Sequence, residues 1–115
     1  MRKTLLALII TAGPVLAEPP EVVDAGFEKT GESWRVSVTL KHPDTGWDHY
    51  ADGWEVLDAA GNRLGFRALA HPHVEEQPFT RSLNGVMLPE GEAVFIRARC
   101  SVDGWAEVPV RFMIE

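Results

Sequence analysis

Apolar and polar residues alternate with a period of two through most of the chain after residue 20. The clearest example is residues 34–41, whose apolar members are Trp34, Val36, Val38 and Leu40. Successive side chains of a strand point to opposite faces of a sheet, so this pattern predicts a strand with one buried face and one face in water. No segment longer than a turn or two has helical spacing. The sequence therefore predicts an all-β protein.

Turn residues divide the alternating segments from one another. Glycine or proline stands between several of them, as at Gly31, Gly61 and Pro89, and these residues suit tight turns. The expected strands are residues 22–29, 34–41, 53–58, 63–70, 79–88, 93–101 and 107–114. Short strands at this spacing predict an immunoglobulin-like antiparallel β-sandwich of about seven strands. The residues expected inside it are Trp34, Val36, Val38, Trp54, Val56, Val94, Ile96, Val110 and Phe112.

Residues 1–17 have the three parts of a secretory signal peptide. A basic start precedes an apolar run over residues 5–10, and small residues follow. We expect cleavage between Ala17 and Glu18, which leaves residues 18–115 as one domain that is periplasmic or secreted. A membrane anchor would need about 20 apolar residues, and the run is shorter than that. We therefore expect no membrane span after removal of the signal peptide.

The charge balance narrows the range of partners. The chain has 11 Lys and Arg residues against 17 Asp and Glu residues. Residues 1–17 contain two of the basic residues and no acidic one, so nine basic residues remain after cleavage and the net charge is −8. The general field of so acidic a domain does not attract nucleic acid or anionic membranes. The sequence therefore predicts no nucleic-acid partner and favours cations as small partners.

The histidines of the chain fall in two of the connections between expected strands. They are His42 and His49 in residues 42–52, and His71 and His73 in residues 71–78. If the strands run up and down in order, both connections reach the same end of the sandwich, together with residues 102–106. The same connections carry several carboxylates. Imidazole with a few carboxylates suits zinc or copper better than calcium.

His71-Pro72-His73 is the most specific motif in these connections. In an extended segment residues i and i+2 project from the same face, so the two rings can meet one ion. Pro72 favours that extended geometry for His71. Two histidines make half of a metal site. We therefore predict a histidine cluster that binds a copper or zinc ion through His71 and His73, with His42 and His49 as further ligands.

Two other interpretations of this end of the sandwich stay open. The histidines can be loop residues that hydrogen-bond backbone carbonyls and stiffen turns, without any metal. Alternatively, Trp47, Tyr50 and Trp105 form a contact surface for a protein partner in the envelope, because large aromatic side chains in loops often mark such surfaces. In that second case the chain is a metal-free interaction module.

Cys100 is the single cysteine of the chain, so no internal disulfide can form. It follows Val94, Ile96 and Ala98 on the apolar side of an expected strand. That position predicts a buried, chemically inert thiol that packs as a small hydrophobic residue. A soft metal ligand or an intermolecular bridge is the alternative.

Motifs for common enzyme chemistry are absent from the sequence. No serine nucleophile stands with a histidine and an acid at a recognisable spacing, and Glu75 and Glu76 in a loop do not form a glycosidase pair. The sequence therefore predicts that the protein is not an enzyme. Together with the signal peptide, this leads us to expect a periplasmic binding or accessory protein.

Two runs of sequence resemble a known group of proteins. They are His71-Pro72-His73-Val74-Glu75-Glu76-Gln77-Pro78-Phe79-Thr80-Arg81-Ser82 and, upstream, Trp47-Asp48-His49-Tyr50-Ala51-Asp52-Gly53-Trp54. The chain resembles uncharacterised small secreted or periplasmic immunoglobulin-like proteins of Gram-negative bacteria, which carry a motif of the HPHxxEQPFTRS type. The resemblance implies a periplasmic location and names no activity.

Overall fold

The computed structural model describes residues 19–115, and the predicted signal peptide lies outside the described residues. The described chain is all β and contains no helix. Its strands are β1 (Glu21–Thr30), β2 (Ser33–Lys41), β3 (Ala51–Leu57), β4 (Arg63–Ala68), β5 (Phe79–Val86), β6 (Ala93–Cys100), β7 (Gly104–Trp105) and β8 (Val110–Met113). Over residues 19–115 there is accordingly no helix that could span a membrane.

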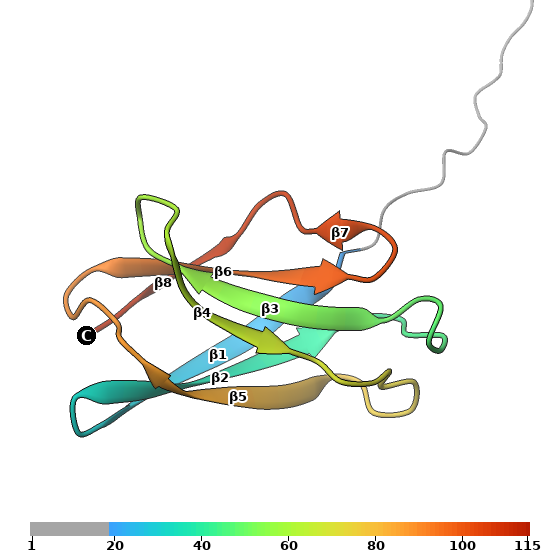
Figure 1. Ribbon diagram of the computed structural model, residues 1–115, viewed down its shortest axis with the longest axis horizontal. Coiled ribbons are helices and arrows are strands. Elements are labelled where there is room, and N and C mark those ends of the chain that lie inside the picture. The colour runs from blue at the N-terminus through green and yellow to red at the C-terminus, as the bar shows by residue number, and fades with distance from the viewer. Residues whose placement is uncertain (1–18) are drawn as a thin grey trace, which may run out of the picture.

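The strands form two antiparallel sheets that face each other (Figure 1). One sheet has the order β1-β2-β5; the other has the order β4-β3-β6-β7, and β8 also pairs with β6. Each strand expected from the sequence overlaps an observed one, and the additional strand is the short β7. The predicted all-β fold with two antiparallel sheets is thus confirmed, whereas the immunoglobulin-like assignment stays a prediction.

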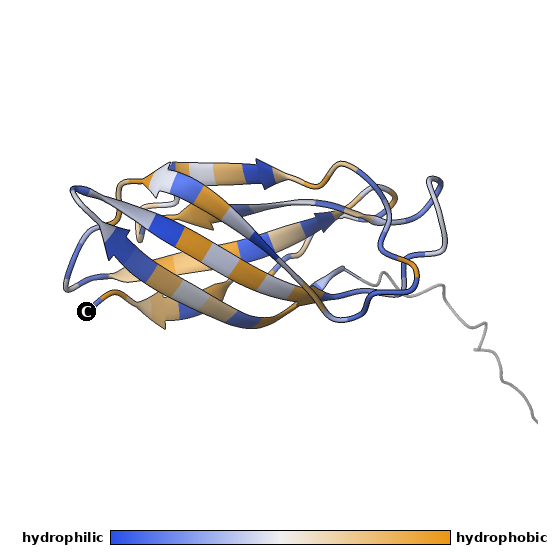
Figure 2. Cartoon of the chain, turned by 90° about the horizontal axis from the view of Figure 1, so that it is seen from below, coloured by the Kyte–Doolittle hydropathy of each residue, from blue (hydrophilic) through white to orange (hydrophobic). Residues whose placement is uncertain are grey.

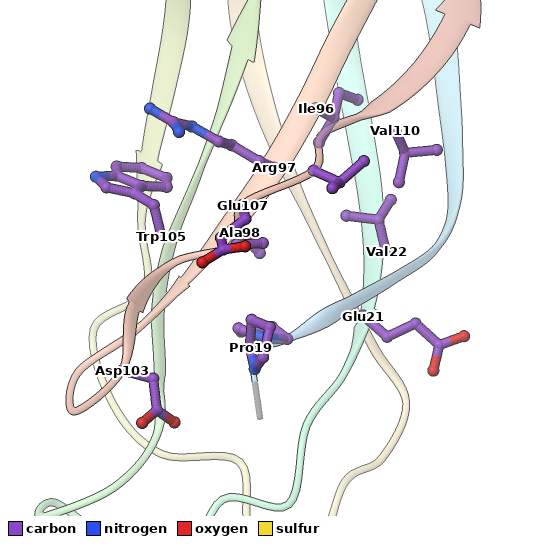
Figure 3. A pocket seen from close by; sticks show the side chains of 13 residues that line it. Pro19, Glu21, Val22, Ile96, Arg97, Ala98, Asp103, Trp105, Glu107 and Val110 are labelled. Atoms are coloured by element: carbon purple, nitrogen blue, oxygen red, sulfur yellow. The ribbon is translucent and has the colours of Figure 1, made fainter. Parts of the chain in front are cut away.

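The alternation in the sequence becomes the core between the sheets, and Figure 2 shows hydrophobic and hydrophilic residues following one another along the strands. Most of the residues expected inside are buried, among them Val36, Trp54 and Ile96, each with no exposed surface. Phe112 is partly buried against this core, and Val110 is 38% exposed. It lies on the edge strand β8 and lines a cleft that opens between β1 and β6 (Figure 3), so the prediction that it is a core residue is wrong.

The connections divide into two kinds at the two ends of the sandwich (Figure 1). The β2–β3, β4–β5 and β6–β7 connections gather at one end, which we call the loop pole; tighter turns, among them β1–β2 and β3–β4, lie at the other, the turn pole. In the β3–β4 turn, the Asp58 carboxylate accepts hydrogen bonds from the backbone N–H groups of Ala60 at 2.9 Å and Asn62 at 2.8 Å. The Asn62 bond is the main reason why the pKa of Asp58 lies below its usual value. The predicted gathering of the histidine connections at one end is confirmed.

Candidate metal centre

His42 directly follows β2, and its imidazole is buried at the loop pole with 1% of the residue exposed. Its Nδ1 lies 2.6 Å from Oδ1 of Asp44, and its backbone N–H donates to Oε1 of Gln77 at 2.9 Å. Because an ionised carboxylate only accepts hydrogen bonds, Nδ1 carries the proton, and in the neutral ring Nε2 keeps a lone pair. That Nε2 atom is buried and has no hydrogen-bond partner among the described residues. A histidine held by a carboxylate on one nitrogen is the usual arrangement of a metal ligand.

Asp44 holds more than the ring of His42. Its Oδ1 also accepts the backbone N–H of Ala51 at 3.0 Å, and its Oδ2 accepts the backbone N–H of His73 at 2.8 Å. Its side chain is fully buried. One carboxylate therefore ties the β2–β3 connection to the start of β3 and to the β4–β5 connection, and this fixes the orientation of His42.

Cys100 ends β6 and lies opposite Ala51 of β3. The residue has no exposed surface, which confirms its predicted burial. Its sulfur accepts the backbone N–H of Val102 at 3.4 Å. Metal ions bind the thiolate form of a cysteine.

His49 reaches the same place from the far side of the β2–β3 connection. A turn at Gly46 shapes this connection: His49 N–H donates to the Gly46 carbonyl at 3.1 Å, and Thr45 N–H donates to the His49 carbonyl at 3.0 Å. Gly46 has a φ of 151°, which favours glycine. The His49 ring centre lies 4.9 Å from that of His42, and its Nε2 lies 3.6 Å from Oδ2 of Asp103.

His42, His49 and Cys100 together form a three-residue group in which one ligand atom from each lies within 4.8 Å of the others. Metal bonds of about 2.0–2.1 Å to nitrogen and 2.3 Å to sulfur place tetrahedral ligands about 3.3–3.6 Å apart. The spacing in the observed group therefore exceeds the ideal spacing by no more than about 1.5 Å. Two imidazoles and a thiol are ligands that zinc, copper and iron accept in proteins. The side chains present thus fit a metal ion, and the unpartnered Nε2 of His42 is the atom that most clearly lacks one.

His71 and His73 form a separate pair at the same pole. Their ring centres lie 4.6 Å apart, and neither belongs to the three-residue group. The His73 ring stacks on Phe79 with centres 3.9 Å apart and an interplanar angle of 11°. Burial is the main cause that lowers the pKa of His73, the nearby positive charge of Arg81 adds to it, and Asp44 opposes it. Metal binding by His71 and His73 stays a prediction.

Cys100 was not among the ligands favoured by the sequence. The alternation correctly places it on the buried face of a strand, but it gives no sign that the end of this face adjoins His42 and His49. One signal was available. Cys100 is the last residue before the connection that up-and-down topology brings to the loop pole, and so it stands beside the histidines.

The loop aromatics belong to two different clusters. Trp47 is 68% exposed and makes an edge contact with Tyr50, with ring centres 5.6 Å apart. Trp105 instead makes an edge contact with Phe66 and lies under the guanidinium of Arg97, which is 4.9 Å from its ring centre. Trp47 and Tyr50 therefore form one ring pair and Trp105 belongs to another, and a contact surface for a protein partner stays a prediction.

A cleft of about 590 Å³ lies beside the loop pole (Figure 3). Its lining comes mainly from the start of β1, from β6 and from the connection between β7 and β8, and includes Val22, Ala98, Trp105 and Val110. None of the three residues of the candidate metal centre lines it, but Asp103, the neighbour of His49, does. The cleft and the metal centre are therefore adjacent and distinct.

The chain shares its fold with superoxide reductase, solved in the oxidized state, at a TM-score of 0.55 and 16% sequence identity, over 90% of this chain and 94% of the other. No family model matches the sequence. At this identity the likeness concerns the fold alone.

A relative at the sequence level comes from Halomicrobium mukohataei (strain ATCC 700874 / DSM 12286 / JCM 9738 / NCIMB 13541) and is described as a "Putative lipoprotein". It is 43% identical over 86 residues, which cover 73% of this chain. The match spans only 42% of the relative's length.

The prediction that the protein is not an enzyme is wrong, because the fold does not exclude enzymes. Its fold is also the fold of superoxide reductase, which is an enzyme. The motifs whose absence supported the prediction belong to serine hydrolases and glycosidases. They have no bearing on chemistry at a metal centre.

Proposed function

We propose that this chain is an envelope-associated protein that binds one divalent transition metal ion through His42, His49 and Cys100. The observation that carries the proposal is the state of His42: its ring is buried, Asp44 holds Nδ1 at 2.6 Å, and Nε2 has no partner among the described residues. A buried polar atom without a partner costs free energy, and a metal ion beside a thiol removes that cost. The location is supported by the lipoprotein relative and by the signal-peptide pattern of residues 1–17.

Zinc and copper are the ions that this ligand set suits best. Both accept two imidazoles and a thiolate, and a three-ligand site leaves a position for water or a small substrate. The role of the chain is then to hold the ligands in place: Asp44 orients His42, and the Val102 N–H donates a hydrogen bond to the Cys100 sulfur. The negative charge of the whole chain also favours a cation.

The test is a cobalt(II) titration of the reduced protein, in which bonding of thiolate to cobalt gives a near-ultraviolet charge-transfer band. We expect the band in the wild type and its loss in Cys100→Ser, with zinc displacing cobalt from the wild type. His71→Ala is the matched control, since His71 lies outside the three-residue group, and it should keep the band. A wild type without the band, or a band retained in Cys100→Ser, would contradict the proposal and would favour the surface of Trp47 and Tyr50 as a site for a protein partner.

Reduction of superoxide is a second candidate function. It is supported by the fold shared with superoxide reductase and by the presence of a thiol among the candidate ligands. A redox-active ion bound there would supply the electron that converts superoxide, with protons, to hydrogen peroxide. We expect the reduced, iron-loaded protein to be oxidised by superoxide from xanthine oxidase, with formation of peroxide, and the Cys100→Ser variant not to react. A wild type that superoxide does not oxidise would rule this function out, and equal reactivity of the two proteins would exclude a role for Cys100 in it.

A further inference from the structure

His73 is the most anomalous side chain of the described chain. The residue is 5% exposed, yet both ring nitrogens are buried and neither has a hydrogen-bond partner among the described residues. Buried polar atoms of native proteins are nearly always paired. Its backbone is fixed, because its N–H donates to Asp44 and its carbonyl accepts the Nε2–H of Gln77 at 2.8 Å. The ring is thus held in place on Phe79 with two nitrogens that nothing satisfies.

His71 completes a pair of nitrogen ligands. Its Nδ1 lies 3.0 Å from the carbonyl oxygen of Pro72. A carbonyl only accepts hydrogen bonds, so Nδ1 carries the proton and the lone pair is on Nε2. Its ring centre is 4.6 Å from that of His73, and His71 is exposed. Rotation of this exposed side chain can bring a nitrogen of each ring to about 2.0–2.1 Å from one ion.

Taken together, the charged groups around His71 and His73 do not repel a cation. Asp44 and Glu76 face His73 with negative charge, Arg81 faces it with positive charge, and His71 is the remaining titratable neighbour. Arg81 is engaged by Glu76 in an ion pair at 3.2 Å. This ion pair offsets the charge of Arg81 beside the two histidines.

We propose that His71 and His73 bind a second divalent transition metal ion, at a site that contains no thiol and opens to solvent through His71. Imidazole ligands suit copper(II), nickel(II) and zinc(II), of which copper(II) binds most tightly to a given set of nitrogens. The site stands on the unpartnered nitrogens of His73 and does not require the His42–His49–Cys100 centre.

Asp44 couples this second site to the first. Its Oδ1 holds the ring of His42 at 2.6 Å, and its Oδ2 holds the backbone of His73 at 2.8 Å. An ion that repositions either histidine acts on the same buried carboxylate, so occupation of one site should change the affinity of the other. This coupling rests on the proposed function, because it needs both sites to bind.

Zinc titration of the full chain by calorimetry, with ions per chain counted by native mass spectrometry, tests the proposal. We expect two zinc ions in the wild type, one in His71→Ala and one in Cys100→Ser. His73→Phe keeps the ring that stacks on Phe79 and removes both nitrogens, so it should fold and also bind one ion. Copper(II) added to Cys100→Ser should give the electron paramagnetic resonance signature of nitrogen ligands, and His71→Ala in that background should abolish it.

The outcomes separate the two proposals. If His71→Ala and His73→Phe bind as many ions as the wild type with unchanged affinity, the second site does not exist. If those variants each lose an ion while Cys100→Ser loses none, the second site stands and the thiol-containing centre fails. Equal affinities of the second ion in the wild type and in Cys100→Ser would overturn the coupling through Asp44.

Discussion

Asp44 at the loop pole and Asp58 at the turn pole both accept backbone hydrogen bonds, but they do so for different purposes. Asp58 accepts hydrogen bonds from Ala60, from Asn62 and, through its backbone carbonyl, from Gly61, and all three lie within four residues of it. Asp44 accepts them from Ala51 and His73 as well as from His42 two residues away. Both carboxylates organise a connection between strands. Only Asp44 reaches a distant segment of the chain.

The two carboxylates differ in whether the polar groups around them have hydrogen-bond partners. The turn around Asp58 is exposed, and its polar groups can meet water. At the loop pole Asp44 is buried, and the groups it positions include the unpartnered Nε2 of His42 and the ring of His73. A turn whose polar groups all have hydrogen-bond partners needs only to reverse the chain. A buried network that leaves imidazole nitrogens without partners is suited to bind a ligand.

The largest effect is expected from Asp44→Ala. It leaves two buried backbone N–H groups and the Nδ1–H of His42 without an acceptor, and each such group costs about 1–3 kcal/mol. We expect a loss of about 3–5 kcal/mol in the free energy of unfolding, measured by urea denaturation. Asp58→Ala is the control at the other pole and should lose clearly less, because water can replace its carboxylate. Equal losses of stability in Asp44→Ala and Asp58→Ala would contradict the difference between the two poles.

Asp44→Asn extends the comparison of Asp44 and Asp58 to metal binding. The amide keeps the shape of the side chain but loses the charge that supports the His42 imidazole as a ligand. We expect zinc affinity at the three-residue centre to fall about 10–100-fold, the usual cost of losing a partner of a ligating histidine. Competition with a chromophoric chelator measures this zinc affinity. Asp58→Asn should leave the affinity unchanged, and a fall there would mean that the two poles are not independent.

The pH dependence of the metal-free protein provides a third contrast. The pKa of His73 is lower in the folded state than its usual value of 6.5, mainly through burial. The unfolded chain then binds more protons in the interval below pH 6.5, so this histidine stabilises the fold above that pH and the stability is lost as the pH falls. We expect the urea midpoint to decrease below pH 6.5 and His73→Phe to flatten that decrease. An unchanged slope in His73→Phe would show that other groups cause it.

Asp103→Asn should have the smallest effect. Oδ2 of Asp103 lies 3.6 Å from Nε2 of His49, with both side chains partly exposed. Water screens such a pair, so we expect zinc affinity to fall less than about 10-fold and less than in Asp44→Asn. The same chelator competition compares the two variants. A larger fall in Asp103→Asn would mean that Asp103 binds the ion directly.

The strands were predictable because alternation records directly which face of a strand is buried, as in residues 34–41. The common pole of the histidines was also predictable, since it follows from the order of the strands. The same order places Cys100 at this pole, but it does not give the short distances from Cys100 to His42 and His49. They depend on the pairing of Ala51 with Cys100 and on the register shift between Ala51 and Gly53, which are tertiary features. The exposure of Val110 likewise depends on where the edge of one sheet stands open.

The ligands of the candidate centre come from segments far apart in the chain, the β2–β3 connection and the end of β6. Long-range strand pairing has to form before they meet, and such pairing is among the slower steps of folding. If the proposed centre binds an ion, loading with metal would therefore follow folding in time. A chain that crosses a membrane unfolded would take up its ion only after arrival, from whatever supply exists there. The ion would then hold the two segments together, and the lifetime of the folded protein would depend on that local supply.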